Sequence, residues 1–119
     1  MRGTTVLIVD DHAGFRDTAR LLLETGGWRV VGEAGDGVQA IAAAREMRPD
    51  VVLVDVNLPG DDGFAVARAI SGDPDPPAVV LTSSRDDAGY GALAGDAGAR
   101  GFIPKLELSV DALRRLVAR

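Results

Sequence analysis

Val51-Val52-Leu53-Val54-Asp55 is the stretch that decides the fold. Its first four positions are apolar and mostly β-branched, which favours a strand, and the run is far too short to cross a membrane. A strand that is apolar on both sides has to be covered on both faces, as in a parallel sheet between two layers of helices. The stretch therefore predicts an α/β fold with helices on both faces of the sheet.

Four more runs of strand length, rich in apolar residues, lie on either side of this stretch, at residues 5–9, 28–31, 78–81 and 101–103. Helical patterns alternate with them. The first has Phe15, Ala19, Leu22 and Leu23 on one face and ends at Gly26-Gly27. Four others are expected over residues 36–47, 63–71 and 86–98 and after an N-cap at Ser109.

Two of these helices carry specific expectations. The helix over residues 36–47 is expected to turn Val38, Ile41 and Ala42 inward. The helix over residues 86–98, from Asp86 onward, contains several glycines, each of which costs about 1 kcal/mol relative to alanine. It is therefore expected to be short, frayed or mobile. Right-handed crossovers between the strands give a five-stranded, doubly wound parallel sheet.

Composition restricts the possible functions. The 119 residues suit one domain, and no further domain, such as an output domain, is visible in residues 1–119. The absence of cysteine excludes disulfides, thiolate metal sites and cysteine nucleophiles, and a net charge of −5 argues against direct nucleic-acid binding. No signal peptide or membrane span is visible, so a cytoplasmic protein is expected.

Polar residues gather where the predicted strands end. Asp10 and Asp11 follow the first strand, Asp55 the third, Thr82 and Ser83 the fourth, and Lys105 comes shortly after the fifth. Ligands of such sheets bind at this edge. Converging carboxylates repel one another, and Mg²⁺, which prefers oxygen ligands and shares its sites with phosphate, relieves that repulsion. A carboxylate can also be a phosphoryl-accepting nucleophile, and we expect Asp55 to be that acceptor.

The same residues resemble the response-regulator receiver domain of two-component signalling, and the likeness covers essentially the whole chain. The most specific part is the run from Asp55 to Gly63, which contains Leu58-Pro59 and Asp62-Gly63, together with the pair Asp10-Asp11 and with Lys105. The resemblance implies a flavodoxin-like sheet with strand order 2-1-3-4-5. It also implies a domain that is no enzyme beyond its own phosphorylation and slow dephosphorylation.

The resemblance also implies roles and partners. Asp55 would take the phosphoryl group from a sensor histidine kinase or a phosphotransfer protein. Mg²⁺ would be held by Asp10, Asp11, Asp55 and the backbone carbonyl of Asn57. Lys105 and Thr82 would bind the phosphoryl group, and Phe102 would be the switch aromatic. The face around the fourth helix and fifth strand would then bind a downstream effector or a second copy of the chain.

Two details depart from the family pattern. The family lysine is often followed by a proline after a cis bond, whereas Leu106 follows Lys105 here and Pro104 precedes it. The spacing from Thr82 to Lys105 is one residue longer than usual, and Ser83 fits the usual spacing. Thr82 is preferred because it directly follows the apolar run, with Ser83 as the alternative.

Other interpretations compete with this one. Gly35-Asp36-Gly37-Val38-Gln39-Ala40 matches a dinucleotide-binding fingerprint, but it follows the second strand rather than the first. A dehalogenase-type phosphatase would need an acid at Asn57, and a Ser-His-Asp hydrolase lacks its G-x-S-x-G turn. A binding module that works without phosphorylation stays open. His12 is expected to be a loop residue near the site, and Asp61-Asp62 are expected to be solvated charges.

Overall fold

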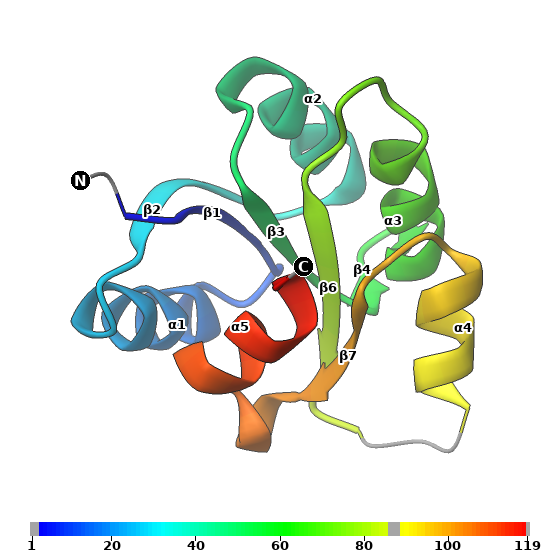
Figure 1. Ribbon diagram of the computed structural model, residues 1–119. Coiled ribbons are helices and arrows are strands. Elements are labelled where there is room, and N and C mark those ends of the chain that lie inside the picture. The colour runs from blue at the N-terminus through cyan, green and yellow to red at the C-terminus, as the bar shows by residue number, and fades with distance from the viewer. Residues whose placement is uncertain (1–2, 86–88, 119) are drawn as a thin grey trace.

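The five predicted strands form one parallel sheet in the computed structural model, which describes residues 3–85 and 89–118 (Figure 1). The sheet order is β2-β1-β3-β6-β7, which is the predicted order 2-1-3-4-5. β3 (Val51–Asp55) pairs with β1 (Thr5–Val9) on one side and β6 (Ala78–Ser83) on the other. β2 (Arg29–Ala34) and β7 (Gly101–Pro104) are the edge strands. The flavodoxin-like sheet is thereby confirmed.

The helices cover both faces of this sheet, as the apolar run of β3 predicted (Figure 1). One face packs against α1 (Ala13–Thr25) and α5 (Val110–Val117), and the other against α2 (Gly37–Met47), α3 (Gly63–Ser71) and α4 (Tyr90–Asp96). Successive strand residues alternate between the two cores, so Leu53 lies in the α1/α5 core while Val52 and Val54 lie in the other. This alternation also determines which side chains at the strand ends lie on the same face of the sheet.

The inward face of α2 differs from the prediction. Val38 is 76% exposed and Ala42 is also exposed, while Gly37, Ala40 and Ala44 are buried. Ile41 is only partly buried against the core. A Cβ atom at Gly37 would come within 2.8 Å of Val66 Cγ2, so this helix lies too close for larger inward side chains. The small residues mark the packing face here, and hydrophobicity alone pointed to the wrong one.

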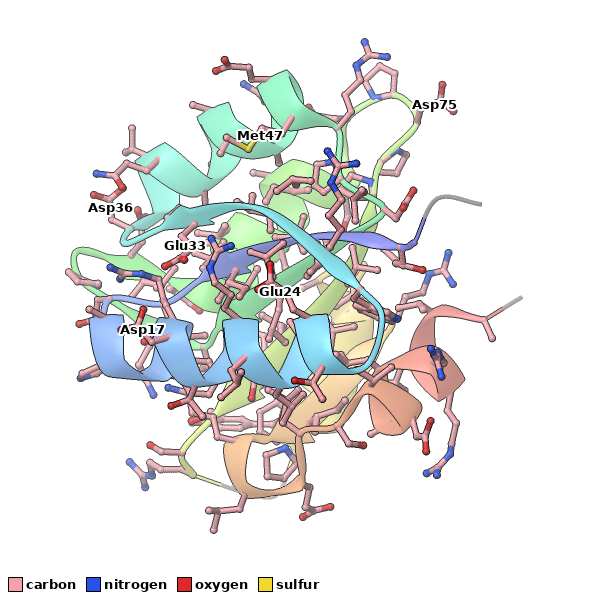
Figure 2. All side chains as sticks on the ribbon, turned by 90° about the vertical axis from the view of Figure 1, so that its left-hand side faces the viewer. Asp17, Glu24, Glu33, Asp36, Met47 and Asp75 are labelled. Carbon is pink, nitrogen blue, oxygen red and sulfur yellow. The ribbon has the colours of Figure 1, made fainter. Side chains whose placement is uncertain are left out.

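Side chains cap three helices at their N-termini. Asp36 accepts a hydrogen bond from the Gln39 N–H at α2, and Ser109 accepts one from the Ala112 N–H at α5, which confirms the predicted cap. Asp62 accepts from the Phe64 N–H and so caps α3, which corrects its assignment as a merely solvated charge. Figure 2 shows Asp36 and Met47 at opposite ends of α2.

A two-stranded hairpin that the sequence did not reveal links β3 to α3. It consists of β4 (Asn57–Leu58) and β5 (Asp61–Asp62). It is followed by Gly63, the first residue of α3, where a Cβ atom would collide with the Asp55 carbonyl oxygen and lie 2.7 Å from Val56 Cα. Glycine is required at this position because the backbone of α3 starts directly against the end of β3.

We expect Gly63→Ala to lower the free energy of unfolding by about 1–3 kcal/mol, because the colliding atoms belong to the backbone and cannot rotate away. Urea denaturation measures this change. Gly95→Ala in α4 is the matched control: apart from its chain neighbours and the nearby backbone of its own helix, no atom of the described residues lies within 4 Å of its Cβ position. The free energy of unfolding of that variant should rise by about 0.5–1 kcal/mol, because alanine has a higher helix propensity than glycine. Equal effects of the two substitutions would contradict this account of Gly63.

The helix with several glycines is short, as predicted. α4 has seven residues, and Gly89 precedes it in a left-handed conformation with φ 95°. Its predicted start at Asp86 lies outside the described residues. A short 3₁₀ turn, Lys105–Glu107, joins β7 to α5. Among residues 3–85 and 89–118, no helix has the length and apolar character that crossing a membrane requires.

Candidate functional site

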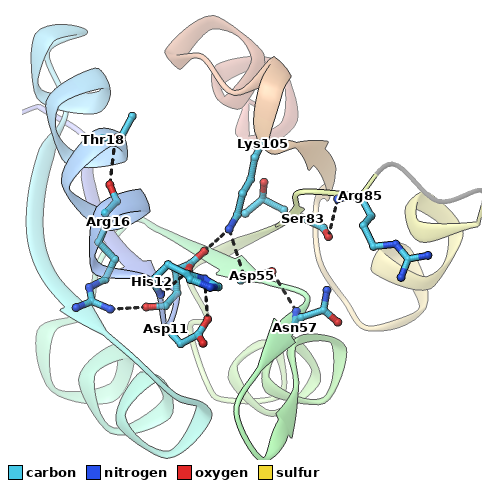
Figure 3. A network of polar contacts seen from close by, with 12 residues as sticks. Asp11, His12, Arg16, Thr18, Asp55, Asn57, Ser83, Arg85 and Lys105 are labelled. Atoms are coloured by element: carbon cyan, nitrogen blue, oxygen red, sulfur yellow. Dashed lines mark hydrogen bonds and ion pairs between the residues drawn. The ribbon is translucent and has the colours of Figure 1, made fainter.

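Three of the predicted polar residues meet at the carboxyl edge of the sheet, two of which, Asp55 and Lys105, are labelled in Figure 3. Asp55 is the last residue of β3, Asp10 directly follows β1, and Lys105 directly follows β7. All three continue the strand alternation on the α1/α5 side of the sheet, since Ile8, Leu53 and Ile103 lie in that core. The sheet geometry therefore brings the side chains of strand ends far apart in sequence into one cluster.

Lys105 lies between the two buried carboxylates. Its Nζ is 2.7 Å from Asp10 Oδ2 and donates to Asp55 Oδ2 at 3.3 Å. It also lies 4.1 Å from the centre of the Phe15 ring, which fixes the ammonium from the α1 side. The described peptide bonds are all trans, including the one after Lys105. One cation thus balances two carboxylates that are almost completely shielded from water, Asp10 at 0% and Asp55 at 4% exposure.

The two carboxylates differ in their protonation tendencies. Burial raises the pKa of Asp55, the negative charge of Asp10 adds to this rise, and the Asn57 N–H and Lys105 oppose it. Burial also acts to raise the pKa of Asp10, but the ammonium of Lys105 and the His12 N–H outweigh it and hold that pKa below its ordinary value. Ionised Asp55 is therefore a destabilised anion in a site that is short of positive charge.

The donor set fits a hard divalent cation. Ligand atoms from Asp10, Asp11, His12 and Asp55 all lie within 4.8 Å of one another. Asp10 Oδ2 is buried, and although Lys105 pairs with it, it has no hydrogen bond within the described part of the chain. Asn57 donates its N–H to Asp55 Oδ1 at 3.0 Å, which keeps its backbone beside this carboxylate. These oxygens are the ligands that Mg²⁺ prefers.

The two candidate hydroxyls are buried but differently engaged. Thr82 pairs with Asp55 across the strands, and its Oγ1 donates to the Ile103 carbonyl at 2.7 Å. Ser83, the last residue of β6, accepts a hydrogen bond from the Arg85 N–H at 3.1 Å, which does not use the proton of its own hydroxyl (Figure 3). β6 thus continues two residues beyond the predicted end, and both hydroxyls lie within it.

Phe102 lies on the opposite face of the sheet from Lys105, partly buried against the α2/α3/α4 core. Its ring centre is 5.1 Å from that of Tyr90, which is 5.7 Å from that of Phe64, and both pairs are edge-on. Tyr90 was not predicted as a partner of Phe102. An aromatic pair of this kind contributes about 0.5–1.5 kcal/mol, so Tyr90 and Phe102 are expected to move together.

Arg16 supports the site from α1 and was also missed. Its Nη1 donates to the Asp10 carbonyl at 2.6 Å, while its Nε donates to Glu33 Oε1 at 2.9 Å. Arg20 reaches the same glutamate, so the side chain of Glu33 links β2 to α1 (Figure 2). Arg16 and Arg20 are one helical turn apart on α1, and only this spacing could have indicated that both side chains contact one acceptor.

The glycines of the rejected dinucleotide fingerprint have a structural role. Gly37 is buried where α2 approaches α3, and Asp36 caps α2. The turn follows the edge strand β2 rather than β1, where the fingerprint would belong. Packing therefore accounts for this glycine without a nucleotide.

Known proteins resemble this chain along most of its length. The chain is 39% identical over 118 residues to the response regulator GacA of Pseudomonas aeruginosa, covering 95% of this chain and 55% of that protein. It is 36% identical over 114 residues to the DNA-binding response regulator MtrA of Mycobacterium tuberculosis, covering 96% and 49%. The chain thus spans about half the length of these curated relatives.

A solved structure and a family model are similar to this chain as well. The signal receiver domain of NarL from Mycobacterium tuberculosis superimposes with a TM-score of 0.89 at 34% identity, covering 100% of both chains. The model of the response regulator receiver domain matches residues 6–118. A match of this extent shows that the chain belongs to the response regulator receiver domains of two-component signalling.

Proposed function

We propose that Asp55 accepts a phosphoryl group, in the presence of Mg²⁺, from a phosphohistidine of a sensor histidine kinase or of a phosphotransfer protein. One observation carries this proposal. Asp55 is a buried carboxylate whose pKa is raised by burial, and it shares a single lysine, Lys105, with a second buried carboxylate, Asp10. Such a pocket lacks positive charge, which a divalent metal ion would supply, and that ion would also offset the negative charge of the incoming phosphoryl group.

The residues divide the work as follows. Asp10, Asp11, Asp55 and the Asn57 carbonyl would hold Mg²⁺, which neutralises charge on the phosphoryl oxygens when bound. An Asp55 carboxylate oxygen attacks phosphorus, the bond from phosphorus to the donor imidazole nitrogen breaks, and the imidazole leaves with the electron pair. Lys105, shared between Asp10 and Asp55 at rest, turns to a phosphoryl oxygen. The domain performs this step on itself and is no turnover enzyme.

The switching face would lie on the other side of β6 and β7. Phosphorylation places new negative charge beside the end of β6, and a hydroxyl of that strand turns toward it. The Tyr90–Phe102 pair lies next to that strand, since Phe102 on β7 pairs with Leu81 on β6. α4 is short and carries two interior glycines, so a change there costs little free energy. This face would bind an effector or a second copy of the chain.

Incubation with acetyl phosphate and Mg²⁺, followed by intact mass measurement, tests the proposal. We expect a mass gain of one phosphoryl group that disappears when EDTA removes the metal. A protein that stays unmodified, and whose spectra do not change with beryllofluoride and Mg²⁺, would overturn the proposal. That result would favour the binding module that works without phosphorylation.

We propose Ser83 rather than Thr82 as the hydroxyl that contacts the phosphoryl group, on the ground of its hydroxyl proton. Strand alternation puts Thr82 on the face of Asp55 and Ser83 on the other face, so Ser83 would have to reach over the end of β6. Thr82 already uses its proton to bind the Ile103 carbonyl, whereas Ser83 uses its oxygen as an acceptor. We expect Ser83→Ala to leave Asp55 phosphorylation within a few fold but to remove most of the spectral change that beryllofluoride causes on α4. Thr82→Val, which removes only the hydroxyl, should keep that change. NMR chemical shifts of the α4 amides measure both, and the reverse ranking would restore Thr82.

A further inference from the structure

His12 is the one donor at the acidic pocket to which the proposed phosphorylation gives no role. Its Nδ1 lies 3.2 Å from Asp10 Oδ1 and 3.1 Å from Asp11 Oδ1 (Figure 3). The side chain is 71% exposed and makes no capping hydrogen bond to α1, although His12 is the N-cap residue of that helix. The fold therefore does not require an imidazole here, while the imidazole faces two of the proposed metal ligands.

The spacing of these donors suits a shared ion. Neighbouring ligands of an octahedral ion with bonds of about 2.1 Å lie about 3.0 Å apart. The two separations at His12 are close to that value, and all four donor atoms lie within 4.8 Å of one another. Asp10 Oδ1 also accepts the backbone N–H of His12 at 2.8 Å, which keeps the residue in place whatever its side chain does.

An imidazole changes which ion the pocket prefers. Carboxylates and carbonyls suit Mg²⁺, whereas an imidazole nitrogen suits Ni²⁺, Co²⁺ and Zn²⁺, which already bind nitrogen and oxygen donors more tightly than lighter divalent ions do. The sequence contains one histidine and no cysteine, so His12 is its only imidazole and no thiolate competes for such ions. Any strong preference for a transition metal in this chain has to come from this residue.

We propose that His12 is a ligand in the acidic pocket and gives it a preference for a divalent transition metal over Mg²⁺ that its oxygen donors alone would not have. The inference rests on the proposed metal site of Asp10, Asp11 and Asp55. It adds a nitrogen to that site and makes the identity of the bound ion depend on the transition metals available to the domain.

Calorimetric titration of the untagged protein with NiCl₂ and with MgCl₂ tests this ligand directly. We expect His12→Ala to weaken Ni²⁺ binding about tenfold or more, which is at least the effect of losing an outer-shell partner of a ligand, and to leave Mg²⁺ binding within about twofold. His12→Gln should match His12→Ala, because an amide is a poor ligand for Ni²⁺. Asp11→Asn is the control for the location of the site and should weaken both ions.

A second measurement separates ligation from a merely structural role. Because the chain has one histidine, the imidazole ¹⁵N signals in an NMR spectrum all belong to His12. Adding ZnCl₂ should shift the Nδ1 resonance strongly and the Nε2 resonance little. If the Nδ1 resonance stays in place, or if Ni²⁺ binds the wild type and both His12 variants equally, the inference is overturned. Neither readout needs phosphorylation, so a failure of the phosphoryl acceptor would be seen separately.

Discussion

We expect Asp55→Asn to abolish the mass gain from acetyl phosphate and Mg²⁺ under conditions that label the wild-type protein. An amide has no anionic oxygen to attack phosphorus, and Asp10, the other buried carboxylate, is already paired with Lys105 and bound by the His12 N–H. Intact mass spectrometry measures the loss. Asp61→Asn is the matched control, because Asp61 is an exposed carboxylate of the adjacent hairpin and should keep wild-type labelling. If the Asp55→Asn variant and the wild-type protein were labelled equally, Asp55 could not be the acceptor.

The same substitution, which should prevent phosphorylation, should also make the fold more stable. Because burial raises the pKa of Asp55, the carboxyl ionises more readily in the unfolded chain than in the folded one. This costs folding free energy as the pH rises from the ordinary value of 3.8 through the raised folded pKa, and the cost then stays constant. Without Mg²⁺ at pH 7, Asp55→Asn should therefore stabilise the fold by on the order of 1 kcal/mol, since Lys105 already offsets part of the buried charge.

Urea denaturation between pH 4 and pH 8 checks this stability change. The difference from wild type should shrink toward pH 4, where the unfolded carboxyl begins to protonate, and should also shrink when Mg²⁺ binds the wild-type protein. An Asp55→Asn protein that is less stable than wild type at pH 7 without metal would show that the carboxylate is favourable in the resting fold. The acceptor would then lack the destabilised charge that we assign to it.

Much of the fold could be predicted because the apolar runs are unambiguous. The run ending at Asp55 is apolar on both faces, which requires two helical layers and places strand ends at a common edge. The inward face of α2 could not be predicted in this way. Ala40 and Ala44 are less hydrophobic than Val38, and only the closeness of α3 makes small side chains the buried ones.

The site residues could be predicted where their position depends only on where a strand ends. Asp10, Asp55 and Lys105 follow directly from the ends of β1, β3 and β7. The preference for Thr82 over Ser83 depended only on where the apolar run ends, and a polar residue at that point does not show whether the strand continues. His12 was expected near the site, but the contacts of His12 and Arg16 with Asp10 depend on how α1 begins after β1, which the sequence does not show.

The second large effect is expected for Lys105→Met, which keeps the apolar stem beside Phe15 and removes the charge shared by Asp10 and Asp55. Breaking a buried pair leaves uncompensated carboxylates, so the variant should lose about 2–4 kcal/mol of unfolding free energy at pH 7 without metal. The ammonium helps to hold the pKa of Asp10 below its ordinary value. Its contribution is therefore complete above pH 3.8 and is lost as the pH falls below that value.

Three comparisons make this loss specific to the site. Arg45→Met, which breaks the exposed pair with Asp73, should leave stability unchanged within error. Adding Asp55→Asn to Lys105→Met should recover part of the loss, because one of the two unpaired carboxylates is then neutral. Mg²⁺ should stabilise Lys105→Met more than wild type, since the ion no longer competes with an ammonium for Asp10. If Lys105→Met is as stable as wild type in metal-free buffer, then the carboxylates share a proton at rest, and the resting site does not depend on this lysine.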